Sequence, residues 1–372
     1  MKNKAQDTDD PWLHRFAVLT AIITFLLLGI GGLVTSHEAG MSVPDWPTSY
    51  GYNMFALPIK FWKGGAFFEH SHRLLASGAG FLTTILAVWL WIKDSRKWMK
   101  WLGVIAFLLV VAQGVLGGLR VTLKMDNLGV IHGVVGQSFF ILLCAIALFT
   151  SRWWVELERR PPARREETSA SQYAGPEAGV PLRWLVLVTT ILIFFQLMLG
   201  ATMRGQHAGL AIPDFPLACG KIWPATGADA VARYNANRIE MNGENPITTF
   251  QIILQMSHRI VALAVFILVA AAAWLSWKRL GGKSPLAKLA VFWLGLIVCQ
   301  IALGAWTIWS NKAADVATLH VLVGALSLMA GALWCILAFR ESVAAVYDRR
   351  KNDRRSQSAA TMGATPAMAV NK

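Results

Sequence analysis

The stretch FAVLTAIITFLLLGIGGLVTS (residues 16–36) decides the fold class, because it carries no charged side chain over a length that can cross a bilayer as one helix. Seven further stretches share this length and apolar character. Together, the predicted spans are 16–36, 68–92, 101–119, 128–150, 184–203, 249–276, 287–307 and 316–339. The sequence therefore predicts an all-α membrane protein with eight transmembrane helices.

The composition of the whole chain agrees with this class. Of 372 residues, 55% are hydrophobic and 15% are charged, whereas roughly 25% are charged in ordinary soluble domains. A soluble enzyme, a disordered chain and a fibrous protein are therefore poor fits. The four cysteines form no CxxC pair, which excludes zinc ribbons, thioredoxin-like sites and covalent haem attachment through CxxCH.

The net charge of +14 is explained by topology rather than by a nucleic-acid partner. The two termini and the segments 93–100, 151–183 and 277–288 hold 24 of the 35 Lys and Arg residues, and the segments on the opposite side hold 9. The positive-inside rule then places both termini in the cytoplasm. We expect residues 151–183 to form a charged, Pro-rich cytoplasmic linker and residues 341–372 to form a disordered tail.

The two halves of the chain repeat the same sequence blocks in the same order. FFEHSHRL (67–74) matches ILQMSHRI (253–260), and AGMSVPDWP (39–47) matches AGLAIPDFP (208–216). Two further blocks match at an offset close to that of the FFEHSHRL block. Gln113, Leu116 and Gly117 match Gln300, Leu303 and Gly304. Ile131, His132 and Gly136 match Leu319, His320 and Gly324. Each half has an even number of spans, so both repeats have the same orientation. We therefore expect two tandem, pseudo-symmetric four-helix bundles, in 1–150 and 184–340, related by an axis near the membrane normal.

Four of the eight histidines occupy repeated positions: His72, His132, His258 and His320. In each half the two lie on different helices at a similar depth near the outer face. Two imidazoles that face each other across a four-helix bundle can bind the iron of a haem on its two axial sides. Ionisable groups are costly inside a bilayer, which favours this interpretation over histidines that only hydrogen-bond between helices. No Glu-x-x-His recurs in both halves, so zinc and di-iron sites are disfavoured.

An arginine directly follows one histidine of each pair. A guanidinium at the membrane edge can bind a haem propionate through two hydrogen bonds, so Arg73 and Arg259 are candidate cofactor-binding residues. The alternative is that each arginine only anchors its helix at the interface.

The two halves differ at one chemically important position. Glu69 lies three residues before His72 and so shares its helix face, about one turn outward. Its counterpart is Gln255, which cannot titrate. A carboxyl group beside a haem pocket can move protons or stabilise positive charge during an oxidation. We therefore expect the first half to be the reactive one, with Glu69 as catalytic residue; the alternative is an interfacial Glu69 that pairs with Arg73.

The combined motifs resemble those of the haem A synthase family, whose members convert haem O to haem A for terminal oxidases. The resemblance covers about residues 15–340 and is carried by GMSVPDWPTSYG (40–51), GLAIPDFPLACG (209–220), EHSHR (69–73), MSHR (256–259) and the IHG and LHV triplets around His132 and His320. It implies that a ring methyl of haem O is oxidised to a formyl group by successive hydroxylations. One departure is that the first outer loop, residues 37–67, lacks the cysteine pair found in some members, which leaves Cys219 alone in an outer loop.

The same resemblance implies a role for each histidine pair. His72 and His132 would hold the substrate haem O in the N-terminal bundle, and His258 and His320 would hold a resident haem B in the C-terminal bundle. Glu69 matches the family's important glutamate. The implied location is the bacterial plasma membrane, with the haem sites toward the outer face.

Partners follow from the same reading. Haem O synthase, a farnesyltransferase, is the expected upstream partner. Because the sequence has no Rossmann or flavin fingerprint, electrons must come from an external donor. Membrane lipid surrounds the spans, and a homo-oligomer is compatible with the sequence. Two rival functions stay open at this point: a di-haem cytochrome b that only transfers electrons, and a transporter with parallel repeats.

Overall fold

The computed structural model describes residues 10–159, 182–237 and 246–362. Within these residues, eight helices are long and apolar enough to cross a membrane, which confirms the eight predicted spans. They are α1 (Pro11–Ser36), α2 (Gly65–Lys93), α3 (Lys97–Thr122), α4 (Asp126–Thr150), α8 (Leu182–Gly205), α10 (Thr249–Leu280), α11 (Pro285–Trp309) and the part Ala314–Arg340 of α12 (Ala314–Met362).

Local sequence signals set several of these boundaries. At the start of α1 the Asp10 carboxylate accepts hydrogen bonds from the backbone N–H groups of Trp12 and Leu13, directly before a proline at the first helical position. Thr248 and Gln251 form a capping box at the start of α10. That helix ends at Gly281, whose φ of 75° is a conformation that favours glycine.

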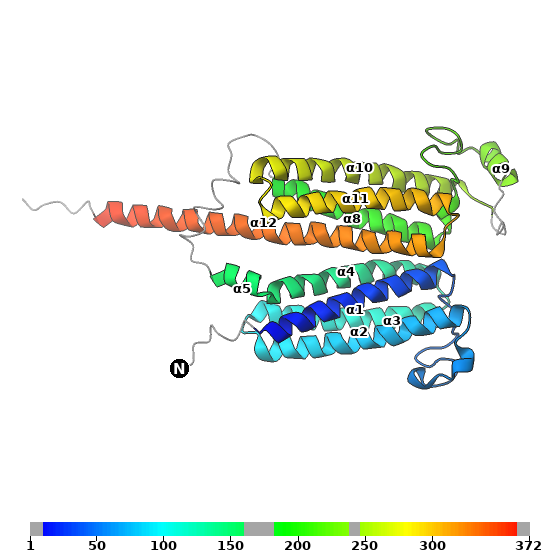
Figure 1. Cartoon of the computed structure of the whole chain (residues 1–372), viewed down its shortest axis with the longest axis horizontal. Helices are drawn as coiled ribbons and strands as arrows, with labels where there is room; N and C mark the ends of the chain where they lie inside the picture. The colour runs from blue at the N-terminus through cyan, green and yellow to red at the C-terminus, as the bar shows by residue number, and fades with distance from the viewer. Residues whose placement is uncertain (1–9, 160–181, 238–245, 363–372) are drawn as a thin grey trace, which may run out of the picture.

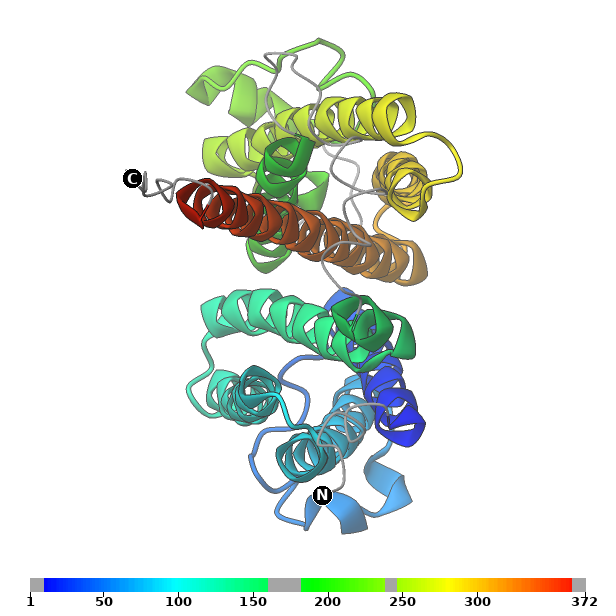
Figure 2. The ribbon, with the colours of Figure 1, turned by 90° about the vertical axis from the view of Figure 1, so that its left-hand side faces the viewer.

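The helices form two four-membered bundles. In the first, α1 contacts α2 and α4, and α3 contacts the same two helices; in the second, α8 and α11 each contact α10 and α12. The bundles meet where α1 and α4 contact α12 and α8, and Figure 2 shows the two groups one above the other. The two halves therefore have the same order of neighbouring helices, while a symmetry axis between them stays a prediction.

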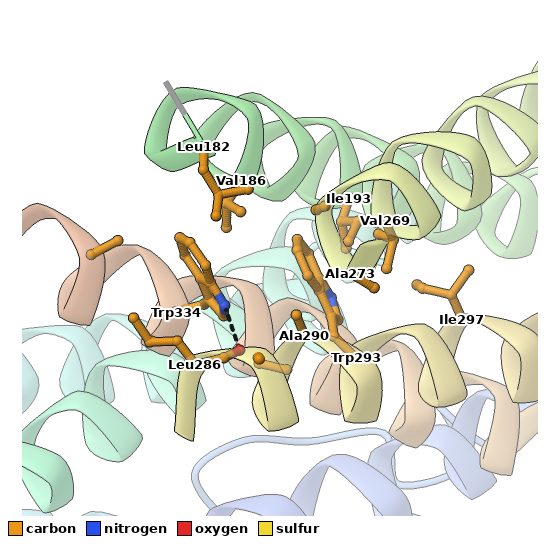
Figure 3. Close-up of a cluster of buried hydrophobic side chains, with 14 of the residues drawn as sticks. Leu182, Val186, Ile193, Val269, Ala273, Leu286, Ala290, Trp293, Ile297 and Trp334 are labelled. Atoms are coloured by element: carbon orange, nitrogen blue, oxygen red, sulfur yellow. Dashed lines mark hydrogen bonds between the residues drawn. The ribbon is translucent and has the colours of Figure 1, made fainter. Parts of the chain in front are cut away.

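Apolar cores fill the end of each bundle that lies away from the histidines. In the second bundle Trp293 and Trp334 are buried among aliphatic side chains (Figure 3), and the indole N–H of Trp334 donates to the carbonyl of Leu286 at 3.0 Å. A matching core in the first bundle includes Leu86, Leu90 and Met99. These cores fix the helices at one end and leave the other end for the polar residues.

Two long outer loops lie at that other end, which is the right-hand end in Figure 1. The first connects α1 to α2 and contains the short 3-10 helices η1 (Met54–Ala56) and η2 (Ile59–Phe61). The second connects α8 to α10 and contains η4 (Ala208–Leu210) and the helix α9 (Ala228–Ala236), which the sequence did not predict.

The structure describes only part of the expected linker and of the expected tail. The linker begins with a short helix, α5 (Arg152–Arg159), and its residues 160–181 lie outside the described part of the chain. Where the sequence predicts a disordered tail, the structure continues α12 as a helix through Met362, and the assignment of residues 341–372 as a cytoplasmic tail stays a prediction. The stretch 341–362 contains no Pro or Gly and has four Ala and four Arg among its 22 residues, so no helix-breaking residue interrupts it. Residues 363–372 lie outside the described residues.

Candidate functional site

The structure brings together the two predicted histidines of the first half. His72 on α2 and His132 on α4 come from helices on opposite corners of the bundle, and their ring centroids lie 6.3 Å apart with an interplanar angle of 65°. Each ring faces a glycine on one of the two other helices of the bundle, α1 for His72 and α3 for His132. A Cβ on Gly31 of α1 would lie 3.2 Å from Nε2 of His72, and a Cβ on Gly117 of α3 would lie 3.4 Å from Cε1 of His132. A larger residue at either position would crowd its imidazole.

The second half repeats this construction. A Cβ on Gly200 of α8 would lie 3.3 Å from Cε1 of His258, and a Cβ on Gly304 of α11 would lie 3.3 Å from Cε1 of His320. The Nδ1 atoms of these two histidines are buried and have no hydrogen-bond partner among the described residues. All four predicted histidines therefore lie in the same setting, against a glycine of a neighbouring helix.

Glutamines fix the backbone at three of these histidines. Gln300 donates to the carbonyl of His320 at 2.7 Å, and Gln196 donates to the carbonyl of His258 at 2.9 Å. The side-chain amide of Gln113 lies 3.2 Å from the carbonyl of His132 and 2.7 Å from its ring Nδ1. These contacts hold the imidazoles in defined places, and Gln113 and Gln300 occupy matching positions in the repeat.

These residues fit a bis-histidine haem site. Imidazole nitrogens bind a metal at roughly 2 Å, so two rings on opposite sides of one iron have centres about 6 Å apart, as the rings of His72 and His132 do. The described residues contain no group of three or more His, Cys, Asp or Glu side chains that could hold a metal ion. The donor set is thus one imidazole pair per bundle, which suits a metal whose other ligands come from a macrocycle.

Glu69 lies under the first outer loop and holds it. Its side chain is buried; Oε1 accepts from Nη2 of Arg73 at 2.7 Å, and Oε2 accepts from the backbone N–H of Val43 at 2.9 Å. Arg73 in turn donates to the carbonyls of Asp45 at 2.7 Å and Thr48 at 3.0 Å. The ion pair with Arg73 that the sequence left open is therefore present.

Gln255 holds the second outer loop at the matching position. Its Oε1 accepts from the backbone N–H of Ile212 at 2.7 Å, and its Nε2 donates to the carbonyls of Ile212 at 3.2 Å and Gly209 at 3.1 Å. Arg259 donates to the carbonyls of Asp214 at 2.7 Å and Leu217 at 2.8 Å. Both candidate arginines therefore contact the loops that cover the histidine pairs.

The two loops have the same internal turn. The Asp45 carboxylate accepts from the backbone N–H groups of Tyr50 at 2.6 Å and Gly51 at 2.8 Å, and Asp214 accepts the same two bonds from Cys219 and its successor. Tyr50 and Cys219 have φ values of 53° and 52°, and each is followed by a glycine with positive φ. The repeated PDWP and PDFP motifs therefore build one turn twice.

Two groups in these loops have shifted pKa values. Burial raises the pKa of Asp45, but hydrogen bonds from the Thr48 hydroxyl and from backbone N–H groups outweigh it, and the net pKa is lowered. Burial, with the charge of Asp214 nearby, raises the pKa of the Cys219 thiol. Cys219 is a free thiol, and a raised pKa disfavours the reactive thiolate.

Two arginines near the histidines were missed in the sequence analysis, which assigned both to outer loops. Arg120, at the end of α3, interacts electrostatically with His72 and His132. Arg204, at the end of α8, interacts with His320 and reaches into the other bundle, where it donates to the carbonyl of Gly32 on α1 at 3.0 Å. The available signal was their spacing: Arg120 comes three residues after Gly117, and Arg204 comes four residues after Gly200. That spacing places each arginine on the same helix face as the glycine that faces a histidine.

Comparison with known proteins gives the family. The sequence pattern of the family described as Cytochrome oxidase assembly protein matches residues 14–333, from α1 into α12. The chain belongs to this family. Among similar members is the Heme A synthase of Rhizorhabdus wittichii, 28% identical, with 87% of this chain and 92% of that protein aligned. The Heme A synthase of Shewanella oneidensis is 25% identical, with 83% and 90% aligned, and that of Lysinibacillus sphaericus is 24% identical, with 87% and 93% aligned. The matched region of this cytochrome oxidase assembly protein contains all four paired histidines and both outer loops.

Proposed function

We propose that this haem-dependent membrane oxidoreductase is a haem A synthase, which oxidises a ring methyl group of haem O to a formyl group by successive hydroxylations. The observation that carries the proposal is the pair of matching histidine sites that differ at Glu69 and Gln255. Two equal haem sites suffice for electron transfer, whereas a buried carboxylate in one site alone gives that site acid–base chemistry.

In this proposal the first bundle is the substrate site. His72 and His132 hold the iron of haem O from its two sides, and the glycines opposite them leave room for the rings. Arg73, with Arg120 near both rings, supplies positive charge for the propionates. The helix pairing thereby orients the ring so that one methyl group always meets the same residues.

The second bundle holds the resident cofactor, haem B. His258 and His320 would hold it, and Arg259, which lies at the loop over this site, would bind a propionate. When bound, this haem supplies one-electron redox chemistry. Arg204 connects α8 of this bundle to α1 of the first bundle.

Glu69 is the catalytic residue in this scheme. Its carboxylate is buried and forms an ion pair with Arg73 at 2.7 Å, and it is the group placed to accept a proton released from the substrate. Removal of water from the twice-hydroxylated carbon leaves the formyl group. Electrons pass through an external redox partner, since the sequence has no dinucleotide or flavin fingerprint.

The cellular setting follows from the same assignment. The protein lies in the bacterial plasma membrane, with both termini in the cytoplasm and the haem sites toward the outer face. Haem O synthase acts upstream and supplies the substrate. Lipid surrounds the eight spans, and a homo-oligomer is compatible with this arrangement.

Glu69→Gln tests the proposal, because it keeps the size of the side chain and removes its titratable charge. We expect the turnover of haem O to fall about 10² to 10⁴-fold, while the resident haem B is retained. The measurement is co-expression with a haem O source, followed by extraction and quantification of haems O and A. Gln255→Glu is the matched variant and should lower turnover per bound haem B far less. Wild-type haem A from a folded Glu69→Gln protein would refute the catalytic role, and absence of haem A from wild type would favour a cytochrome b that only transfers electrons.

A further inference from the structure

The two outer loops cover equivalent sites but are fastened in different ways. In the first half most hydrogen bonds from α2 to the loop come from Arg73. It donates to the carbonyls of Val43 at 3.2 Å, Asp45 at 2.7 Å and Thr48 at 3.0 Å, and to the hydroxyl of Ser49 at 3.4 Å. Glu69 adds one bond, from the N–H of Val43. Displacing Arg73 would therefore leave only one of these five hydrogen bonds, that from Val43 to Glu69.

In the second half, the hydrogen bonds from α10 to loop residues 209–217 are divided between two residues, Gln255 and Arg259. Gln255 binds both backbone polar groups of Ile212, because an amide accepts from the N–H and also donates to the carbonyl, which an ionised carboxylate cannot do. It makes a further bond to the carbonyl of Gly209. Arg259 holds two other carbonyls. Moving Arg259 would therefore leave three bonds from Gln255 in place.

The first loop can move as a preformed unit. Its turn is held by bonds within the loop, from Tyr50 and Gly51 to the Asp45 carboxylate, and by the Tyr50 hydroxyl, which donates to the carbonyl of Ser42 at 2.7 Å. None of these bonds involves α2. Release from Arg73 therefore frees the loop without unfolding its turn.

From these contacts we propose that the residue at the Glu69/Gln255 position decides which haem site exchanges its haem. The Glu69–Arg73 pair makes the first loop a gate: an anionic propionate that draws Arg73 away also releases the loop, so substrate enters and product leaves. Gln255 keeps the second loop closed whether or not Arg259 turns to a propionate, so the resident haem stays bound. This inference rests on the proposed function in taking the first half as the substrate site.

Hydrogen–deuterium exchange on the full-length protein in detergent measures directly how firmly each outer loop is held against its helix. We expect the amides of loop residues 42–49 to exchange faster than those of residues 211–218. Gln255→Glu should speed exchange of the second loop about five- to thirtyfold, because it removes two donated hydrogen bonds of ordinary strength. Loss of haem B to an excess of apomyoglobin should speed up by a similar factor. Gln206→Glu adds the same charge at an exposed position near that loop and should change neither rate.

The reciprocal variant keeps the inference testable if Gln255→Glu does not fold. Glu69→Gln should slow exchange of the first loop, because the new amide can bind both backbone polar groups of Val43 as Gln255 binds those of Ile212. Equal exchange of the two wild-type loops, or second-loop exchange unchanged in Gln255→Glu, would overturn the proposal.

The pigment bound to Glu69→Gln separates this inference from the proposed function. If Glu69 acts on the chemical step, the purified variant retains unconverted haem O. If it acts only on the gate, bound haem O is converted once and haem A stays on the protein. Failure of haem O oxidation in wild type would refute the synthase assignment. The difference in exchange between the two loops would still hold, because it is measured without turnover.

Discussion

Gly304→Ala tests whether the glycines opposite the histidines are needed to hold a haem. Gly304 on α11 faces His320, and an added Cβ would lie 3.3 Å from Cε1 of that ring. Gly295 is the matched control, because it lies on the same helix and a Cβ there meets no described atom within 4 Å. Both changes add one methyl group to α11 and improve its helix propensity equally.

The size of the effect follows from the contact distance. Carbon atoms in ordinary contact lie about 3.5–4.0 Å apart, so His320 must move by a few tenths of an ångström. Metal–ligand distances are held within roughly 0.2 Å, and a shift of this size therefore strains the bond from iron to nitrogen. Overpacking of this kind costs about 1–3 kcal/mol, which corresponds to about five- to 140-fold weaker haem binding.

The assay is the haem B content per protein and the low-spin visible spectrum of each purified variant. Gly304→Ala should lose haem during purification, or show a weakened low-spin signal, while Gly295→Ala should match wild type. If both variants keep wild-type haem content and spectra, the glycine does not make room for a ligand, and His320 loses its main structural support as an axial ligand.

Two further predictions concern the resident site and the topology. His258→Ala and His320→Ala should each abolish or markedly shift the low-spin haem B signal, since each removes one axial nitrogen; unchanged spectra in both would defeat the ligand assignment. The uneven distribution of Lys and Arg predicts that both termini and the 151–183 linker face the cytoplasm, so a reporter fused at either end should be active only inside, and cleavage of the linker by protease added from outside would reverse the orientation.

Much of the site could be predicted from the sequence because its signals are local or periodic. Span length predicted the eight helices, and the repeat singled out His72 and its three equivalents, which the structure places in matching surroundings. The continuation of α12 to Met362 was not predicted, because composition alone does not show that a helix already formed in the membrane can continue into a charged segment. Arg120 and Arg204 were missed because boundary rules placed them in loops.

By itself, the sequence determined the class of protein, the number of spans, the repeat and the identity of the paired histidines, since bilayer thickness and helix period act on each segment separately. Only the tertiary structure decided what Glu69 and Gln255 contact. Both reach backbone groups of loops about 26 and 43 residues earlier in the chain, and no local pattern encodes which distant peptide a buried side chain will meet. The pairing of each histidine with a glycine of a neighbouring helix was likewise decided by how the bundles close, because it depends on the rotation of one packed helix against another.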